Sequence, residues 1–389
     1  MLYRPESFEP LTGEPWDEAR VRHAIARVVA DTDEAYDAET LWPANEWDAW
    51  MSTPPLKDLY CGAAGVVWAL DVLRRRGYAE TSVDLAAAIA RTLELWQEAP
   101  DLSGLDWLPE PRQPSLLAGE GGLLVVAYRL SPSAELVDRL FDRVRENVDN
   151  PAQELMWGSP GTMLAALALH GWSGERRWLE VWQESADALN AARDSDGLWT
   201  QRIERDEEGR FLGPVHGLLG NVHALRTGGD EGAVPAAAAV LAREAVLEDG
   251  LANWPALAGG SLVAGDGEIR LQWCHGSPGV VATAAPYLEE ELLLAGAELT
   301  WQAGAQGEAK GVGLCHGTAG NGYALLKAFE RTGDEVWLER ARRFAVHALA
   351  QAERGPGRYS LFTGDLGAAL FAASCLEADA RFPVLDGWD

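Results

Sequence analysis

The chain has 389 residues, 47% of them apolar, and 60 acidic against 32 basic residues give it a formal net charge of −28. A surface this negative repels phosphate backbones and anionic lipids, so nucleic acid and membrane surfaces are poor partners. The sequence shows neither an apolar run of the roughly 18 residues that a membrane span needs nor a secretory signal, which predicts a cytoplasmic protein. Lysine occurs only at positions 57, 310 and 327, and this acidic, lysine-poor composition predicts adaptation to high salt, where screening removes self-repulsion.

The first predicted helix covers residues 17–37 and precedes a motif that organises the rest of the chain. A G-x-x-G sequence occurs seven times, each time followed by an apolar helical stretch. An internal repeat at this spacing is typical of stacked helical units. The glycine pairs are Gly62 and Gly65, Gly119 and Gly122, Gly158 and Gly161, Gly217 and Gly220, Gly276 and Gly279, Gly317 and Gly320, and Gly364 and Gly367.

Each interval between motifs has room for two helices. Residues 321–333 ("NGYALLKAFERTG") are small and apolar, as expected for a buried helix. Residues 334–355 open with acids, follow an amphipathic pattern and end at glycine, as expected for a surface helix. Strand signals are confined to short pieces such as "GEIRLQW" (residues 267–273).

A single helical hairpin cannot bury its apolar face, so such hairpins must stack on one another. Seven of them predict a closed ring, an all-α (α/α)7 toroid, formed by a single domain over residues 1–389. Each inner helix should then begin within a few residues of a glycine pair. We expect the glycines to permit positive φ and close backbone approach.

Two of the motif copies contain the same tripeptide, Cys274-His275-Gly276 and Cys315-His316-Gly317. Two thiolates and an imidazole suit zinc, and a Cys2His set leaves a fourth coordination position open. Neighbouring repeats would bring the two cysteines together, although the spacing alone does not decide which histidine binds. The remaining cysteines, Cys61 and Cys375, are expected to pack in the core.

The sevenfold glycine motif, the copy "WCHGSPG" and the copy "GLCHGTAGN" resemble the lanthionine synthetase C-like family over nearly the whole chain. The segment "QWCHGSPGV" (residues 272–280) is more similar in sequence to the stand-alone eukaryotic members than to the bacterial lantibiotic cyclases. The resemblance implies zinc held by Cys274, Cys315 and His316, with His275 left free.

The resemblance also implies roles for further residues near the metal. His216 in "VHGLLG" is a candidate acid or base, and Glu154 occupies the acidic position four residues before Gly158. Lys310, five residues before Cys315, matches a lysine that positions a thiol substrate in glutathione-binding relatives. Three arginines match family positions, with a solvent-facing charge as an equal alternative: Arg4 and Arg354 as possible thiol contacts, and Arg270 as a catalytic candidate.

These residues predict an enzyme that forms C–S bonds. Zinc lowers the pKa of a bound thiol, and the thiolate could add to a dehydroalanine or dehydrobutyrine residue to give a thioether. His216 would then protonate the α-carbon. The expected partners are a small thiol such as glutathione and a dehydrated peptide or protein.

Three other functions stay open at this point. An intramolecular lanthionine cyclase would use a cysteine of the substrate peptide itself. A zinc-stabilised scaffold would bind without turnover. A toroidal glycosidase would use paired carboxylates and no metal, which the two Cys-His copies disfavour.

Overall fold

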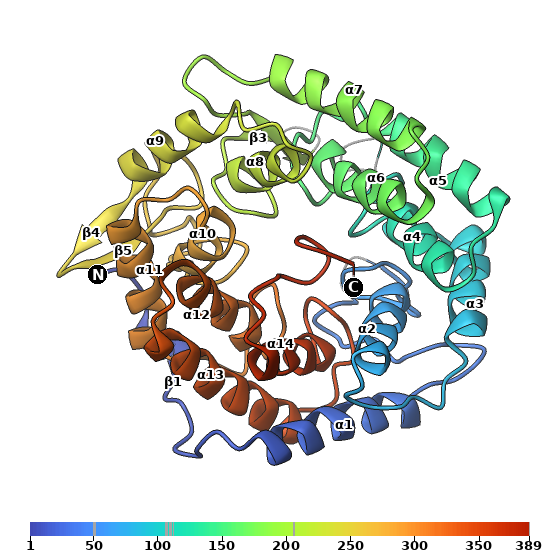
Figure 1. The fold of residues 1–389 in the computed structure, drawn as a ribbon, viewed down its shortest axis with the longest axis horizontal. Helices are drawn as coiled ribbons and strands as arrows, with labels where there is room; N and C mark the ends of the chain where they lie inside the picture. Colours follow the sequence, from blue (N-terminus) through green and yellow to red (C-terminus); the bar gives the residue numbers. More distant parts are fainter. Residues whose placement is uncertain (50–51, 106–107, 109–110, 112, 205–206, 389) are drawn as a thin grey trace.

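The helices of the protein form two concentric rings (Figure 1). The structure is a computed structural model, and it describes residues 1–49, 52–105, 108, 111, 113–204 and 207–388. Within these residues fourteen α-helices alternate along the chain between the outer and the inner ring. The predicted (α/α)7 toroid is therefore confirmed.

The inner ring consists of the seven apolar helices. The first glycine of each motif is the N-cap of one inner helix, so the motif marks where that helix begins. Neighbouring inner helices pack against one another around the ring, and the last packs on the first. The inner helices are α2 (Ala63–Arg75), α4 (Glu120–Leu130), α6 (Ser159–Ser173), α8 (Leu218–Thr227), α10 (Ser277–Ala284), α12 (Thr318–Thr332) and α14 (Asp365–Glu377).

The outer ring consists of helices that bury one face and expose the other. Several begin at a capping side chain: Asp17 accepts a hydrogen bond from the backbone N–H of Arg20, and Ser133 accepts one from Leu136. The helix predicted over residues 17–37 is the first of them. The outer helices are α1 (Glu18–Glu34), α3 (Leu85–Glu98), α5 (Ala134–Glu146), α7 (Arg177–Ala191), α9 (Val234–Glu244), α11 (Glu290–Ala303) and α13 (Glu335–Arg354).

The glycine motifs serve close backbone approach rather than positive φ. Of the seven N-capping glycines, Gly276 has φ 96°, whereas the other six have negative φ, so the expectation of positive φ is wrong for them. A Cβ on the second glycine of any copy would collide with a backbone carbonyl oxygen in the loop before the helix, such as that of Leu314 for Gly320. Glycine there lets the loop fold directly onto the first helical turn.

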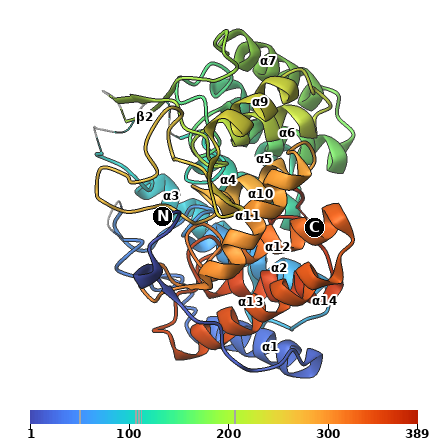
Figure 2. The same cartoon turned by 90° about the vertical axis from the view of Figure 1, so that its left-hand side faces the viewer.

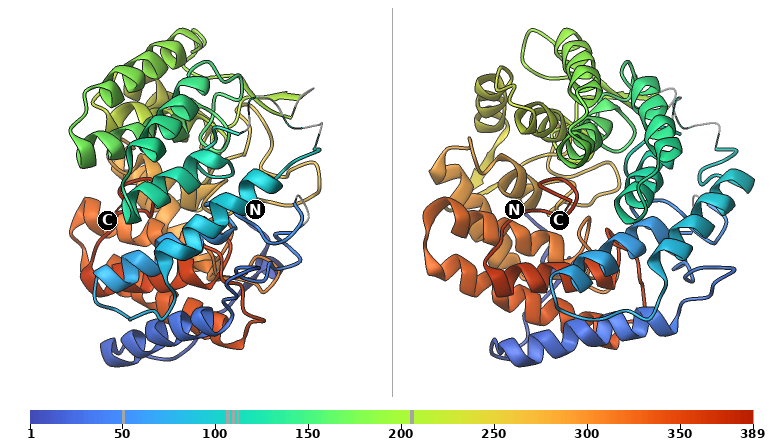
Figure 3. Two further views of the ribbon diagram at one scale, coloured as in Figure 1. Left: turned by 90° about the vertical axis from the view of Figure 1, so that its right-hand side faces the viewer. Right: turned by 45° about the vertical axis from the view of Figure 1, so that its right-hand side comes forward.

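Short strands join the loops at one end of the ring. Each pair is antiparallel: β1 (Phe8–Glu9) with β6 (Ala305–Gln306), β2 (Gln201–Glu204) with β3 (Glu207–Gly209), and β4 (Val246–Glu248) with β5 (Leu251–Asn253). The segment "GEIRLQW" forms isolated bridges and no strand. Figures 2 and 3 show the N-terminus among these loops and the C-terminus at the other end.

The core lies between the two rings and inside the inner one. The inner helices are buried on nearly all sides, which matches their uniformly apolar sequences. No helix of the described residues is long and apolar enough to cross a membrane.

Candidate metal centre

Cys274, Cys315 and His316 come together at the loop end of the ring. Each lies in the loop before an inner helix, Cys274 before α10 and the other two before α12. The loops are joined directly, because the Cys274 N–H donates to the carbonyl oxygen of Cys315 (3.2 Å). One ligand atom from each of the three side chains lies within 4.8 Å of the others, and this is the one such group in the described part of the chain.

The donor set fits zinc. In the described structure the Cys315 Sγ and the His316 Nε2 are 3.7 Å apart. Two ligands at zinc's usual Zn–S and Zn–N lengths and a tetrahedral angle are separated by about 3.5 Å. Both cysteines are buried and His316 is half-buried. The three residues could hold zinc with one position free for a ligand.

The pKa values of the two thiols shift in opposite directions. Burial disfavours the Cys274 thiolate, but a hydrogen bond from Cys315 and the neighbouring His316 outweigh it and lower the pKa of Cys274. Burial and the adjacent Cys274 raise the pKa of Cys315. Two adjacent thiolates in a buried site repel each other, and a divalent cation between them would remove that repulsion.

A histidine–glutamate pair lies next to the cysteine loops. The His216 Nδ1 is 2.8 Å from the Glu154 Oε2. Glu154 is fully buried and also accepts the backbone N–H groups of Met156 (2.9 Å) and Trp157 (2.5 Å), so it is held in place and acts as an acceptor. The His216 Nδ1 therefore donates, and Nε2 is the ring nitrogen left to exchange a proton on a half-buried ring.

His275 links this pair to the cysteines without joining the three-residue group. Its ring stacks on His216 with centroids 6.1 Å apart and an interplanar angle of 22°. The Nδ1 of His275 is buried without a hydrogen-bond partner in the described structure. Burial lowers the pKa of His275 to about 4, so its imidazole is neutral near pH 7.

The four predicted cationic residues differ in their surroundings. The Lys310 ammonium is close enough to Cys315 to favour its thiolate. Arg270 pairs with Asp266 and acts electrostatically on His275. Arg4 donates to the carbonyl oxygen of Gly267 (3.0 Å), so Arg4 and Arg270 meet at one loop before Cys274.

Arg354 is not part of the group formed by Cys274, Cys315 and His316. Its guanidinium pairs with Glu9, which also binds His347 and Gln351. Its place beside the site was inferred from resemblance, and its observed partner is a carboxylate on the N-terminal strand.

Arg358, which sequence reasoning missed, lies beside the site. Its guanidinium pairs with Asp48 (Nε–Oδ2 2.8 Å) and covers the Trp47 ring at 4.7 Å. Trp47 in turn packs edge-on against His316 with centroids 5.1 Å apart. In the sequence, Arg358 is an arginine six residues before Gly364. That spacing alone does not indicate that the side chain reaches Asp48 and Trp47.

Gln272 and Tyr60 also contact the cysteines. The Gln272 Nε2 donates to the Cys274 Sγ at 3.0 Å. Burial and the two nearby thiols raise the pKa of Tyr60, which hydrogen-bonds to Cys315. Such donors orient ligands and tune their basicity.

The remaining cysteines have different environments. Cys375 is fully buried in α14, as expected of a core residue. Cys61 is half-buried, so its core assignment is wrong: its Sγ lies 3.6 Å from Asp58 in the loop before α2.

Comparisons with known proteins identify a family. The family described as "Lanthionine synthetase C-like protein" matches residues 51–386. Glutathione S-transferase LANCL1 of Danio rerio is 27% identical over 70% of this chain and 74% of its own length. LanC-like protein GCL1 of Arabidopsis thaliana is 32% identical over 29% of each.

Among solved structures, nisin cyclase superposes with a TM-score of 0.64 at 16% identity, covering 91% of this chain and 94% of its own, which supports the fold. This family includes cyclases that form C–S bonds. The chain belongs to the lanthionine synthetase C-like family.

Proposed function

We propose that this chain adds a zinc-activated thiol to a dehydroalanine or dehydrobutyrine residue and so forms a thioether. The observation that carries the proposal is the position of the Cys274, Cys315 and His316 ligand atoms within 4.8 Å of one another, in loops adjoining the His216–Glu154 pair. Bound zinc would supply a Lewis acid that keeps a substrate thiol ionised near neutral pH.

The remaining steps fall to side chains of the chain itself. The substrate sulfur bonds to the β-carbon, and the electron pair of the C=C bond moves toward the neighbouring carbonyl to give an enolate. His216, oriented by Glu154, accepts the proton of the substrate thiol on its Nε2 and then delivers that proton to the α-carbon of the enolate. Cationic groups near the cysteine loops, Lys310 and Arg270, favour the negative charge of the enolate.

We propose a small anionic thiol of the glutathione type as the donor and a dehydrated peptide or protein as the acceptor. The printed name of LANCL1, a glutathione S-transferase, supports this source of sulfur. The cationic groups near the site stand out in a chain of net charge −28 and suit an anionic donor.

A single domain and a cytoplasmic location stay predictions.

Intramolecular ring closure is the second candidate. The resemblance in fold to nisin cyclase favours it, although that comparison at 16% identity concerns architecture. A cyclase needs a cysteine in the acceptor peptide, whereas a transferase accepts a peptide without one. A dehydroalanine peptide lacking cysteine therefore separates the two.

The metal is tested by the zinc content of purified variants. We expect about one zinc per wild-type chain, lost in Cys315→Ala because two remaining ligands hold zinc poorly. His275→Ala is the matched control, because it removes the neighbouring imidazole and should keep the metal. Zinc lost with His275→Ala and kept with His316→Ala would show that the ligand histidine is misassigned. A protein without zinc in any preparation would overturn thiol activation.

Turnover is tested by mass spectrometry of a dehydroalanine peptide incubated with a panel of small thiols. The expected result is a mass increase equal to one whole thiol, since addition releases nothing. Bound zinc without any adduct would support the non-catalytic scaffold instead.

A further inference from the structure

Residues 379–388, here called the C-terminal segment, cross the interior of the ring. Figure 1 shows the chain end in the middle of the inner helices. The segment contacts helices from several sides of the ring. Trp388 packs edge-on against Trp68 of α2 and Trp172 of α6, and Phe382 packs against Tyr323 of α12.

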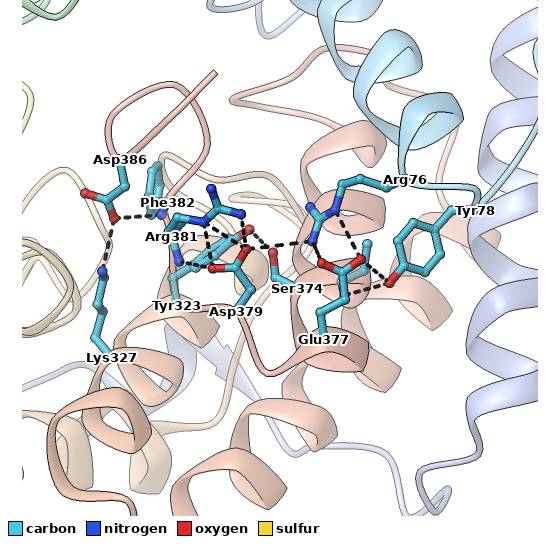
Figure 4. A network of polar contacts seen from close by, with 11 residues as sticks. Arg76, Tyr78, Tyr323, Lys327, Ser374, Glu377, Asp379, Arg381, Phe382 and Asp386 are labelled. Atoms are coloured by element: carbon cyan, nitrogen blue, oxygen red, sulfur yellow. Dashed lines mark hydrogen bonds and ion pairs between the residues drawn. The ribbon is translucent and has the colours of Figure 1, made fainter. Parts of the chain in front are cut away.

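Buried charge anchors the segment. Figure 4 shows the ion pair between Lys327 and Asp386, in which the Nζ is 3.1 Å from the Oδ2. The backbone N–H of Phe382 donates to the same oxygen (2.8 Å). The His223 Nε2 is 3.0 Å from the carbonyl oxygen of Leu385. Lys327 is one of three lysines in the chain and is 7% exposed, and its ammonium pairs with Asp386 and, also at 3.1 Å, with Glu330 of its own helix.

The segment reaches the metal loops through one aromatic contact. Phe382 stacks on Trp273 with centroids 4.4 Å apart and an interplanar angle of 13°. Trp273 is fully buried and directly precedes Cys274, and its ring also contacts Phe362, whose carbonyl oxygen accepts the N–H of Cys315. Phe382 therefore contacts the residue directly before Cys274, and it is connected to Cys315 through Trp273 and Phe362.

Packing alone orients the Trp273 ring. Its indole N–H is buried without a hydrogen-bond partner in the described part of the protein. A ring that no hydrogen bond fixes takes its orientation from the side chains that enclose it. Phe382 has the closest stacking geometry of these, so a change there transmits to the backbone that presents Cys274.

We propose that Phe382 is a positioning residue for the metal centre, so that the C-terminal segment holds the Cys274 loop in its ligand geometry from inside the ring. The inference rests on the proposed metal site and concerns how that site is kept in shape. It assigns the segment a role in metal affinity in addition to stability.

Three changes at position 382 and one control test this in the full-length protein. Phe382→Leu and Phe382→Met remove the stacked ring with side chains of different shape, whereas Phe382→Tyr retains it. Trp388→Leu is the control: Trp388 is a buried aromatic of the same segment that packs on Trp68 and Trp172. Zinc affinity is measured by competition with a chromophoric chelator, coordination geometry by the absorption spectrum after cobalt substitution, and stability by the melting temperature.

We expect Phe382→Leu and Phe382→Met to weaken zinc binding by about 10- to 100-fold, the range seen for outer partners of metal ligands, and to shift the cobalt spectrum. Phe382→Tyr should bind zinc as the wild type does. Trp388→Leu should lower the melting temperature and leave zinc affinity and the cobalt spectrum unchanged. Unchanged zinc affinity in Phe382→Leu, or equal weakening in Trp388→Leu, would overturn the inference alone. A wild-type protein that binds neither metal would overturn the proposed function together with it.

Discussion

At the scale of single residues, the proposed chemistry depends on one oriented imidazole. Glu154 has no exposed surface and accepts hydrogen bonds from two backbone N–H groups and from His216. A carboxylate held this firmly fixes which nitrogen of His216 carries the proton. The two residues should therefore differ in how much activity their loss removes.

We predict that His216→Ala lowers the turnover number by about 100-fold or more, because the proton donor is lost. Glu154→Gln keeps an acceptor oxygen for His216 and should cost less. Both variants should keep zinc, since neither residue is a proposed ligand. Steady-state rates with a dehydroalanine peptide, measured beside metal content, check this; loss of zinc in His216→Ala would contradict the assigned role.

A second residue-scale prediction concerns Asp58. Burial and the neighbouring Asp101 raise its pKa to about 7, against roughly 3.9 in an unfolded chain. Between these values the folded chain binds more protons on Asp58 than the unfolded chain does. Its contribution to stability is therefore full below about pH 4 and is lost as the pH rises toward 7.

Asp58→Asn should flatten the decline in the free energy of unfolding over that pH range, because asparagine has no proton to lose. Denaturant unfolding at several pH values measures it. The exposed Asp249→Asn is the control and should leave the profile as it is. A decline of equal size in Asp58→Asn and the wild type would rule the mechanism out.

At the scale of elements, the second glycine of each motif decides whether the preceding loop can lie on its helix. A Cβ at Gly161 would meet the carbonyl oxygen of Leu155 at the start of α6. Gly171, near the end of the same helix, is exposed and has open space where a Cβ would go. One helix thus offers both a constrained glycine and an unconstrained one.

Gly161→Ala should destabilise the protein by about 1–3 kcal/mol, because backbone must move to admit the methyl group. Gly171→Ala should stabilise it by about 0.5–1 kcal/mol through helix propensity. Denaturant midpoints of the two variants provide the comparison. Equal effects at both positions would mean that close approach is not why glycine is present.

At the scale of the whole molecule, the net charge of −28 predicts a response to salt. Screening shortens the range of self-repulsion from about 10 Å at 0.1 M to about 3 Å at 1 M. The melting temperature should therefore rise as potassium chloride increases from about 0.1 M to 2 M. Chloride is preferable to sulfate, because sulfate also strengthens apolar burial. An unchanged or falling melting temperature would contradict adaptation to high salt and leave the proposed chemistry untouched.

The fold and part of the candidate site could be predicted from the sequence alone. Seven glycine pairs with apolar and amphipathic stretches between them predicted the number, order and starts of the inner helices, because glycine spacing and burial pattern are local properties. The repeat of Cys-His-Gly placed Cys274 and Cys315 in neighbouring units, which the ring then brings together.

Tertiary structure decided what depends on contacts between distant segments. Arg358 lies beside the site because it pairs with Asp48, whose neighbour Trp47 packs against His316. Arg354 instead pairs with Glu9 on the N-terminal strand. The contact between Phe382 and Trp273 joins positions more than a hundred residues apart. Periodicity along a chain reports which face of an element is buried, but the partner on that face is set by how the whole ring closes.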